Sequence, residues 1–171
     1  MTDKEAELIK QYPEAPLIVA MAESAWAGSH IAAKIEFSLS DDLKLKLKEL
    51  LGKEVCKVFI TDSDVRHIKN HHGRNEDRRG QIDITPTDLA LIPVVLNEYD
   101  TIECMGEDKI GNKKLLFTKK IEEAIYVASI ERGNNQIGVI TLWKRKNKSP
   151  TGCLMPSIEP ANLGTFGSIV R

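Results

Sequence analysis

The sequence predicts an α+β fold in which N-terminal helices are followed by a four-stranded antiparallel meander. Two observations predict this fold class. Capped helical segments recur through the first half of the 171-residue chain, and four strand-like runs with short separators occupy residues 100–144. A hydrophobic content of 42% is sufficient for a core, and 29% charged residues provide a water-exposed surface.

Residues 1–51 are predicted to form a helical N-terminal extension. Within it, residues 3–36 favour helical or irregular structure. The next segment, SLSDDLKLKLKELLGK, is typical of a helix with Ser40 or Asp41 as its N-cap and Gly52 as its stop. Most of its leucines form one stripe, although the Leu/Lys alternation leaves a strand as the alternative.

A second helix is predicted around a group of histidines. The segment EVCKVFIT (54–61) is β-branched and aromatic, which is typical of a short strand. Thr61 and Asp64 then stand three residues apart, the spacing of a capping box. We therefore expect a helix that begins near Asp62 and ends at Gly73.

A third helical segment precedes the meander. After the charged loop GRNEDRRGQID, the segment TPTDLALIPVVLNEYD has Thr85 as its cap, Pro86 at the first helical position and Asp88 at the third. Pro93 is expected to kink this helix or to split it. The strand-like runs DTIECM, KLLFTKKI, AIYVASIE and IGVITLWK follow, and their short connections favour antiparallel neighbours. The predicted organisation is an extension (1–51), an α+β domain (52–147) and a Pro/Gly-rich tail (148–171).

Charge and cysteine content narrow the class of protein. The formal net charge is −1, so bulk charge does not indicate a nucleic-acid binder, although residues 132–171 carry six basic residues against one acid. The three cysteines are far apart and lack the spacing of a zinc finger, which is typical of reduced thiols in a cytoplasmic protein. The longest apolar stretch is too short to span a bilayer, and the acidic N-terminus is unlike a secretory signal.

The segment VRHIKNHHGR, residues 65–74, contains three of the four histidines. On a helix His67 and His71 share a face, and His72 lies about 140° round from His67. One interpretation is that these histidines only interact favourably with the helix C-terminus. Another is that His67 and His71 bind a metal, but Ile68 stands where a zinc protease carries its glutamate, and no third ligand is close in sequence.

A third interpretation is metal-free cleavage of RNA. This reaction needs a base for the 2′-OH proton, an acid for the leaving 5′-oxygen and cations around the phosphorane. Imidazoles and neighbouring Arg and Lys side chains supply these groups. On the last predicted strand, Thr141 offers a hydroxyl, and Trp143 shares its face as a base-stacking platform beside a basic run. Each of these residues alone fits a structural role, and their combination favours catalysis.

The residues HIKNHHG, in the pattern H-I-x-x-x-H-G, resemble the phage-associated barnase–EndoU–colicin–RelE-like nucleases. The resemblance covers about residues 52–147. It implies a barnase/RelE-like fold and a metal-independent ribonuclease without a cofactor. The two histidines of the pattern fall on His67 and His72, and the strand hydroxyl falls on Thr141. The near-neutral charge and the preceding 50 residues depart from the family's pattern.

The combined prediction is a toxin-like, cytoplasmic endoribonuclease of phage or mobile-element origin, from a bacterial or phage-associated setting. Its expected partners are RNA, with tRNA as one candidate, and an inhibitor (antitoxin) protein, but no membrane. The predicted catalytic residues are His67, His72 and Thr141, and the predicted substrate-binding residues are Arg66, Lys69, His71, Trp143, Lys144 and Lys146, with no metal ligand. The alternatives are a catalytically inactive module that binds RNA or protein, and a metal-dependent hydrolase that uses His67 and His71.

Overall fold

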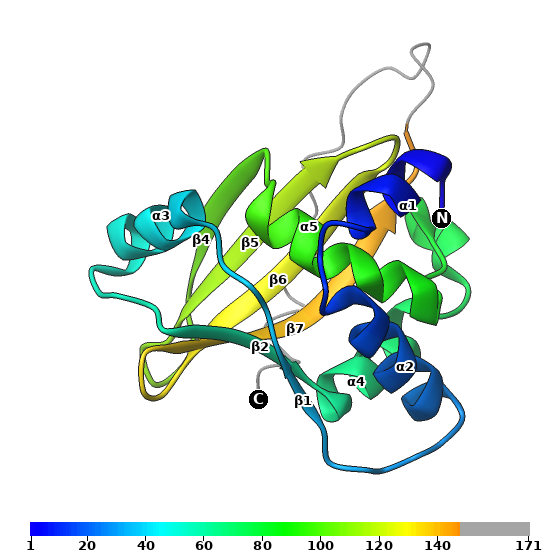
Figure 1. The fold of residues 1–171 in the computed structure, drawn as a ribbon, viewed down its shortest axis with the longest axis horizontal. Helices are drawn as coiled ribbons and strands as arrows, with labels where there is room; N and C mark the ends of the chain where they lie inside the picture. Colours follow the sequence, from blue (N-terminus) through cyan, green and yellow to red (C-terminus); the bar gives the residue numbers. More distant parts are fainter. Residues whose placement is uncertain (148–171) are drawn as a thin grey trace.

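A computed structural model describes residues 1–147 of the chain, so the predicted tail lies outside the described residues. The helices are α1 (Asp3–Ile9), α2 (Ala15–Trp26), α3 (Asp41–Leu51), α4 (Asp62–His72) and α5 (Ile92–Asn97), with the 3₁₀ helices η1 (Glu76–Arg79) and η2 (Pro86–Leu91). The strands are β1 (Lys34–Glu36), β2 (Lys57–Thr61), β3 (Gln81–Ile82), β4 (Thr101–Glu107), β5 (Lys113–Lys120), β6 (Ala124–Arg132) and β7 (Gln136–Arg145). In Figure 1 the helices α1, α2 and α5 lie over one face of a twisted sheet.

The strands form one mixed sheet in the order β1-β2-β7-β6-β5-β4, and β3 also pairs with β7. Strands β4 to β7 form the predicted antiparallel meander, so the α+β class is confirmed. The sheet is larger than the predicted four strands, because β2 pairs with β7 in parallel and β1 pairs with β2. The three-residue strand β1 was not predicted, since it is too short to show a period of its own.

Helix α4 lies beside the middle of β7. Strand β2 pairs with the start of β7, from Gln136 to Gly138, and β3 pairs with its end, at Lys144 and Arg145. Between these pairings α4 packs against β7, and in Figure 1 it follows β2 directly. The histidine helix is therefore held against the strand segment that contains the predicted Thr141.

The helix boundaries follow the predicted capping signals. Thr61 and Asp64 form a capping box, and α4 begins directly after Thr61. Ser40 caps α3, and Gly52, in the left-handed conformation with φ of 72°, ends it. Pro93 stands near the junction of η2 and α5, so the predicted splitting of the third helical segment is confirmed.

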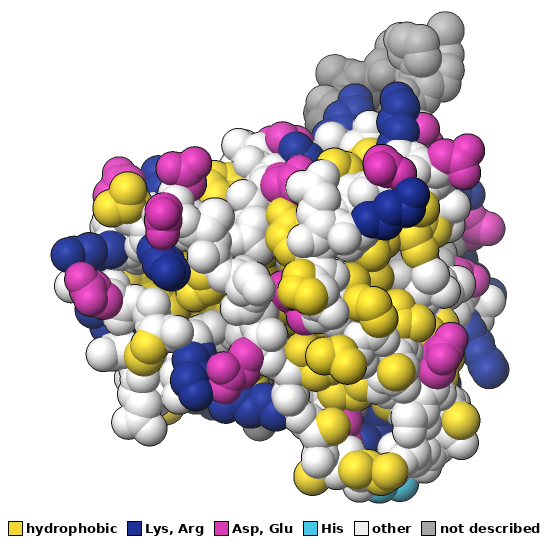
Figure 2. All heavy atoms as spheres, viewed as in Figure 1, with side chains coloured by type: hydrophobic (Ala, Val, Ile, Leu, Met, Phe, Trp, Pro, Cys, Tyr) yellow, Lys and Arg dark blue, Asp and Glu magenta, His cyan; other side chains and the backbone are white. Residues whose placement is uncertain are grey.

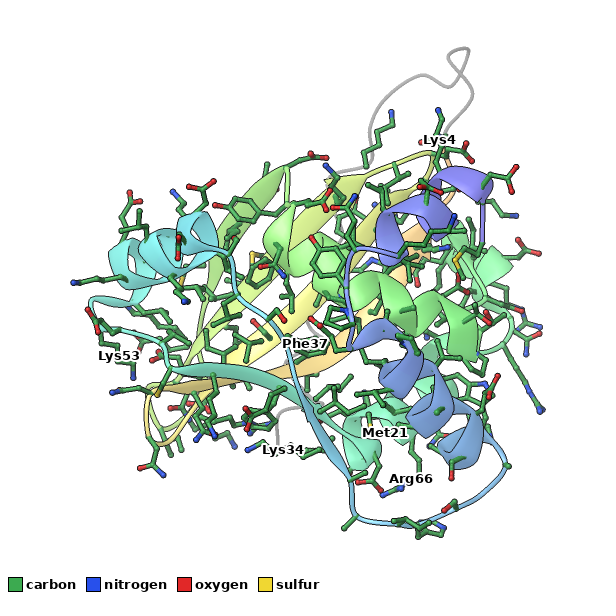
Figure 3. The ribbon with its side chains drawn as sticks, in the orientation of Figure 1. Lys4, Met21, Lys34, Phe37, Lys53 and Arg66 are labelled. Carbon is green, nitrogen blue, oxygen red and sulfur yellow. The ribbon has the colours of Figure 1, made fainter. Side chains whose placement is uncertain are left out.

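One hydrophobic core lies between the helices and the sheet. Phe37, labelled in Figure 3, is one of its members. Residues on both sides of position 51 contribute to this core, among them Ile18, Leu43, Leu47, Ile60, Phe117 and Val139. Within residues 1–147, none of the helices combines the length and the apolar character needed to cross a membrane.

A smaller apolar cluster lies on the other side of the sheet, which we call the second face. Its members are Leu116, Ala128, Ile130, Ile140 and Trp143. Thr141 pairs with Ala128 in the register, so its side chain also lies on the second face. The register between β6 and β7 shifts beside this pair, where Ile140 is the extra residue. Such bulges often re-aim side chains next to functional sites.

Candidate active site

The histidines of α4 are arranged as the helical spacing predicts. The rings of His67 and His71 lie side by side, with 4.1 Å between their centroids and 31° between their planes. His71 is exposed, whereas the Nε2 atom of His67 is buried and has no hydrogen-bond partner in the described part of the chain. His67 therefore presents an unpaired nitrogen that a bound group can use.

The protonation of His67 is set by its surroundings. Burial, reinforced by the neighbouring His71 and His72, lowers the pKa of His67 from 6.5 to about 4. The imidazole is consequently neutral at pH 7. A neutral imidazole is the form that accepts a proton, so His67 is suited to act as a general base.

His72 is buried in a different environment. Its Nδ1 lies 3.0 Å from Oε2 of Glu76, which is itself buried. Burial lowers the pKa of His72, and the hydrogen bond and charge of Glu76 oppose this effect. A carboxylate beside an imidazole fixes the orientation of the ring and stabilises its protonated form. The His72–Glu76 pair is therefore a candidate proton donor or acceptor.

His72 also connects α4 to the sheet through aromatic contacts. Its ring lies 6.0 Å from that of Trp143, with 22° between the planes, and the Trp143 ring stacks on Tyr126 at 5.1 Å and 7°. Since α4 and β6 flank β7 on opposite sides, Trp143 lies between the two partners. Because the Trp143 ring already stacks against His72 and Tyr126, a base stacking directly on it, as the sequence predicted, is disfavoured.

Thr141 is the second polar side chain with an unpaired atom at this junction. Thr141 is 1% exposed, and within the described residues its Oγ1 has no hydrogen-bond partner. Leaving a buried hydroxyl unpaired costs about 1–3 kcal/mol. The side chain lies two residues before Trp143, on the second face, as the alternation predicted. A group that occupies the site can satisfy this hydroxyl.

Two of the predicted phosphate-binding cations make contacts within the protein. Arg66 pairs with Asp62 and donates a hydrogen bond to the carbonyl oxygen of Ser29, and Figure 3 shows it near the loop that follows α2. Lys69 donates a 2.8 Å hydrogen bond to the carbonyl oxygen of Trp26. Arg66 therefore points toward the loop after α2, and Lys69 points toward the end of α2, so the structure does not bring them to the histidines.

The two predicted lysines at the end of β7 are also paired. Lys144 is 5% exposed, and its Nζ lies 3.1 Å from Oε1 of Glu5 and 2.8 Å from Oδ1 of Asp88. It projects to the helix-covered face, which argues against a phosphate-binding role. Lys146 is exposed and pairs with Asp77. In Figure 2 positive and negative side chains are interspersed on the helix-covered side, so this side presents no uniformly basic surface.

The structure reveals two residues, Glu76 and Tyr126, that the sequence did not single out. Glu76 stands four residues after His72, but it lies in a segment interpreted as a loop. Tyr126 is opposite Trp143 only because of the β6–β7 register. Arg132 is exposed and lies across Gly138, where its Nε would be 3.0 Å from an added Cβ. Among residues 1–147, no group of three or more His, Cys, Asp or Glu side chains is placed to hold a metal ion.

Comparison with known proteins relates this arrangement to one family. The family model described as phage-Barnase-EndoU-ColicinE5/D-RelE like nuclease3 matches residues 31–150, more than half of the chain. No curated protein and no solved structure matches. The match includes α4 and β7, and it begins just before β1.

Proposed function

Because the chain belongs to the phage-associated barnase–EndoU–colicin–RelE-like nuclease family, we propose that it is a metal-independent, toxin-like endoribonuclease. The observation that carries this proposal is the presence of two buried polar atoms without hydrogen bonds, His67 Nε2 and Thr141 Oγ1, on elements that pack together. The proposed substrate is RNA, with tRNA as one candidate. The proposed protein partner is an inhibitor (antitoxin), since the cell that makes such an enzyme must block it.

In the proposed reaction, neutral His67 takes the proton of a ribose 2′-hydroxyl, and the 2′-oxygen attacks the adjacent phosphorus. The bond from phosphorus to the 5′-oxygen breaks. His72, protonated and oriented by Glu76, donates its proton to the leaving 5′-oxygen. The products are a 2′,3′-cyclic phosphate and a 5′-hydroxyl.

Polar side chains on the second face would stabilise the phosphorane. Thr141 would donate its hydroxyl hydrogen to a non-bridging oxygen, which would satisfy the buried Oγ1. The exposed Arg132 would supply positive charge in place of the paired Arg66 and Lys144. His71, exposed beside His67, is a predicted substrate-binding residue whose ring contacts the proposed base.

The function is tested by incubating the purified protein with total RNA, with and without EDTA, and by analysing the product ends. We expect cleavage that EDTA does not reduce and fragments that end in a 2′,3′-cyclic phosphate. Cleavage that EDTA abolishes would instead support the metal-dependent hydrolase that uses His67 and His71. RNA binding without cleavage would support the inactive binding module.

The pH dependence of cleavage follows from the two histidines. A base with a pKa of about 4 and an acid with a pKa below 6.5 give an acidic optimum of kcat/KM, between these limits. Above this range His72 loses its proton and the rate falls about tenfold per pH unit. Glu76 raises the pKa of His72, so Glu76→Gln is expected to move the alkaline limb to lower pH. A rate that keeps rising above pH 7 would contradict His72 as the acid.

A further inference from the structure

The side chain of Gln81 is a buried amide that the proposed mechanism does not use. Gln81 is 0% exposed, and neither its Nε2 nor its Oε1 has a hydrogen-bond partner among residues 1–147. In the register of β3 with β7 it stands opposite Arg145, whereas Ile82 stands opposite Lys144. Because Lys144 points to the helix-covered face, alternation places the Gln81 side chain on the second face, with Trp143.

The segment that follows Gln81 is bonded to His72, the proposed acid, and to Glu76. The backbone N–H of Ile84 donates a 2.8 Å hydrogen bond to the carbonyl oxygen of His72. The backbone N–H of Glu76 donates a 2.8 Å bond to Oδ1 of Asp83. The first bond ties the segment after β3 to the C-terminal end of α4, and the second ties it to η1, which carries Glu76. Gln81 therefore belongs to the same junction of α4, β3 and β7 as the proposed catalytic residues.

A purely structural role does not explain why an amide side chain is buried at position 81. An amide side chain offers two hydrogens to donate and an oxygen that accepts, and burial of all of them unpaired is unfavourable. An apolar residue of the same size would fill the same space without that cost. An amide without hydrogen bonds in the free protein is explained if a ligand forms hydrogen bonds with it in the bound state.

We propose that Gln81 is a specificity-determining residue that hydrogen-bonds the edge of a nucleobase of the RNA substrate, an inference that rests on the proposed ribonuclease function. A phosphate offers only acceptors and would leave Oε1 of Gln81 unpaired. A base edge offers an adjacent donor and acceptor, and amide side chains pair with adenine in this way. The neighbouring stack of Trp143 and Tyr126 ends in a half-buried Tyr126 ring, beside which an unpaired base can stack.

The proposal is tested with Gln81→Met, which keeps the volume and removes the amide. Oligonucleotides with one ribonucleotide, varied in base at each flanking position, give kcat and KM for every sequence. We expect the wild type to prefer one base at one position by about 5- to 150-fold. We expect Gln81→Met to lose this preference, mainly through KM, without lowering its urea unfolding midpoint. An unchanged preference in Gln81→Met would overturn the proposal.

Ser129→Ala is the matched control. Ser129 is also fully buried, and its Oγ has no hydrogen-bond partner among the residues that the structure describes. It stands opposite Val139, a member of the main core, and so lies on the helix-covered face. We expect Ser129→Ala to leave the base preference unchanged. An equal loss of preference in Ser129→Ala would show that any buried substitution in the sheet has this effect, and would overturn a specific role for Gln81.

A binding experiment separates this proposal from the proposed function. All-deoxy oligonucleotides lack the 2′-hydroxyl and are not cleaved by the proposed mechanism. Their affinities for the wild type and for Gln81→Met test the base contact even if no RNA is cleaved. A base-dependent affinity that Gln81→Met abolishes supports the contact, whether or not the ribonuclease function holds. Affinities that are independent of base in the wild type would contradict it.

Discussion

Replacing His67 with alanine is expected to lower kcat for RNA cleavage by about 10²–10⁴-fold, the range for loss of a general acid or base. The buried, unpaired Nε2 is the feature that distinguishes this histidine from its neighbour His71. Because the pKa of His67 is about 4, the imidazole is available as a base throughout the neutral range. The measurement is single-turnover cleavage of a defined RNA at several pH values.

The control for this variant is His30→Ala. His30 is exposed and lies in the loop after α2, away from α4 in sequence. We expect His30→Ala to retain the wild-type rate. The unfolding midpoint of each variant in urea shows whether the fold is intact. A His67→Ala protein that is folded and cleaves at the rate of His30→Ala would rule out His67 as the base.

The second large effect is on stability. Lys144→Ala is expected to lower the free energy of unfolding by about 3–5 kcal/mol, because it leaves two buried carboxylates without their cation. Glu5 and Asp88 are 1% and 4% exposed, so water does not solvate their charges once the ammonium is removed. Burial alone would raise the pKa of Asp88, but the hydrogen bonds from Lys144 and Thr85 outweigh it and lower that pKa. Urea unfolding at pH 7 measures the loss.

Lys146→Ala is the matched control for this prediction. Lys146 stands two residues further along the chain and also pairs with an aspartate, but its pair is exposed. Exposed ion pairs contribute little, so we expect Lys146→Ala to remain close to the wild type. Combining Lys144→Met with Glu5→Gln and Asp88→Asn should recover much of the loss, because no charge is then left unpaired. Equal unfolding midpoints for Lys144→Ala and Lys146→Ala would refute the role of the buried cluster.

The elements with local signals could be predicted from the sequence. The capping box at Thr61 and Asp64 fixes the start of α4 through bonds between residues three apart. Gly52 and Pro93 likewise set helix boundaries through the local conformation of the backbone. β1 has no such signal, since its three residues are extended only through pairing with β2. The parallel pairing of β2 with β7 likewise depends on residues far apart in the chain.

The relative positions of the histidines could be predicted from helical spacing, whereas the contacts of the lysine and arginine side chains could not. Whether Lys144 faces solvent depends on Glu5, which is 139 residues away in sequence. The enclosure of Trp143 depends on which residue of β6 stands opposite it, and a bulge sets that register. Contacts of this kind arise from tertiary packing and leave no periodic pattern in a single sequence.

The position of β7 between β2 and β6 has a consequence for biosynthesis. Among residues 1–147, β7 is the last strand to be synthesised, and β3 to β6 are synthesised between α4 and β7. A ribosome-bound chain that has not yet released β7 lacks the surface against which α4 docks. Pairings between such distant segments also form late in folding. The junction of α4 and β7 can therefore form only after residue 145 has left the ribosome, so any activity that depends on this junction is absent from shorter nascent chains.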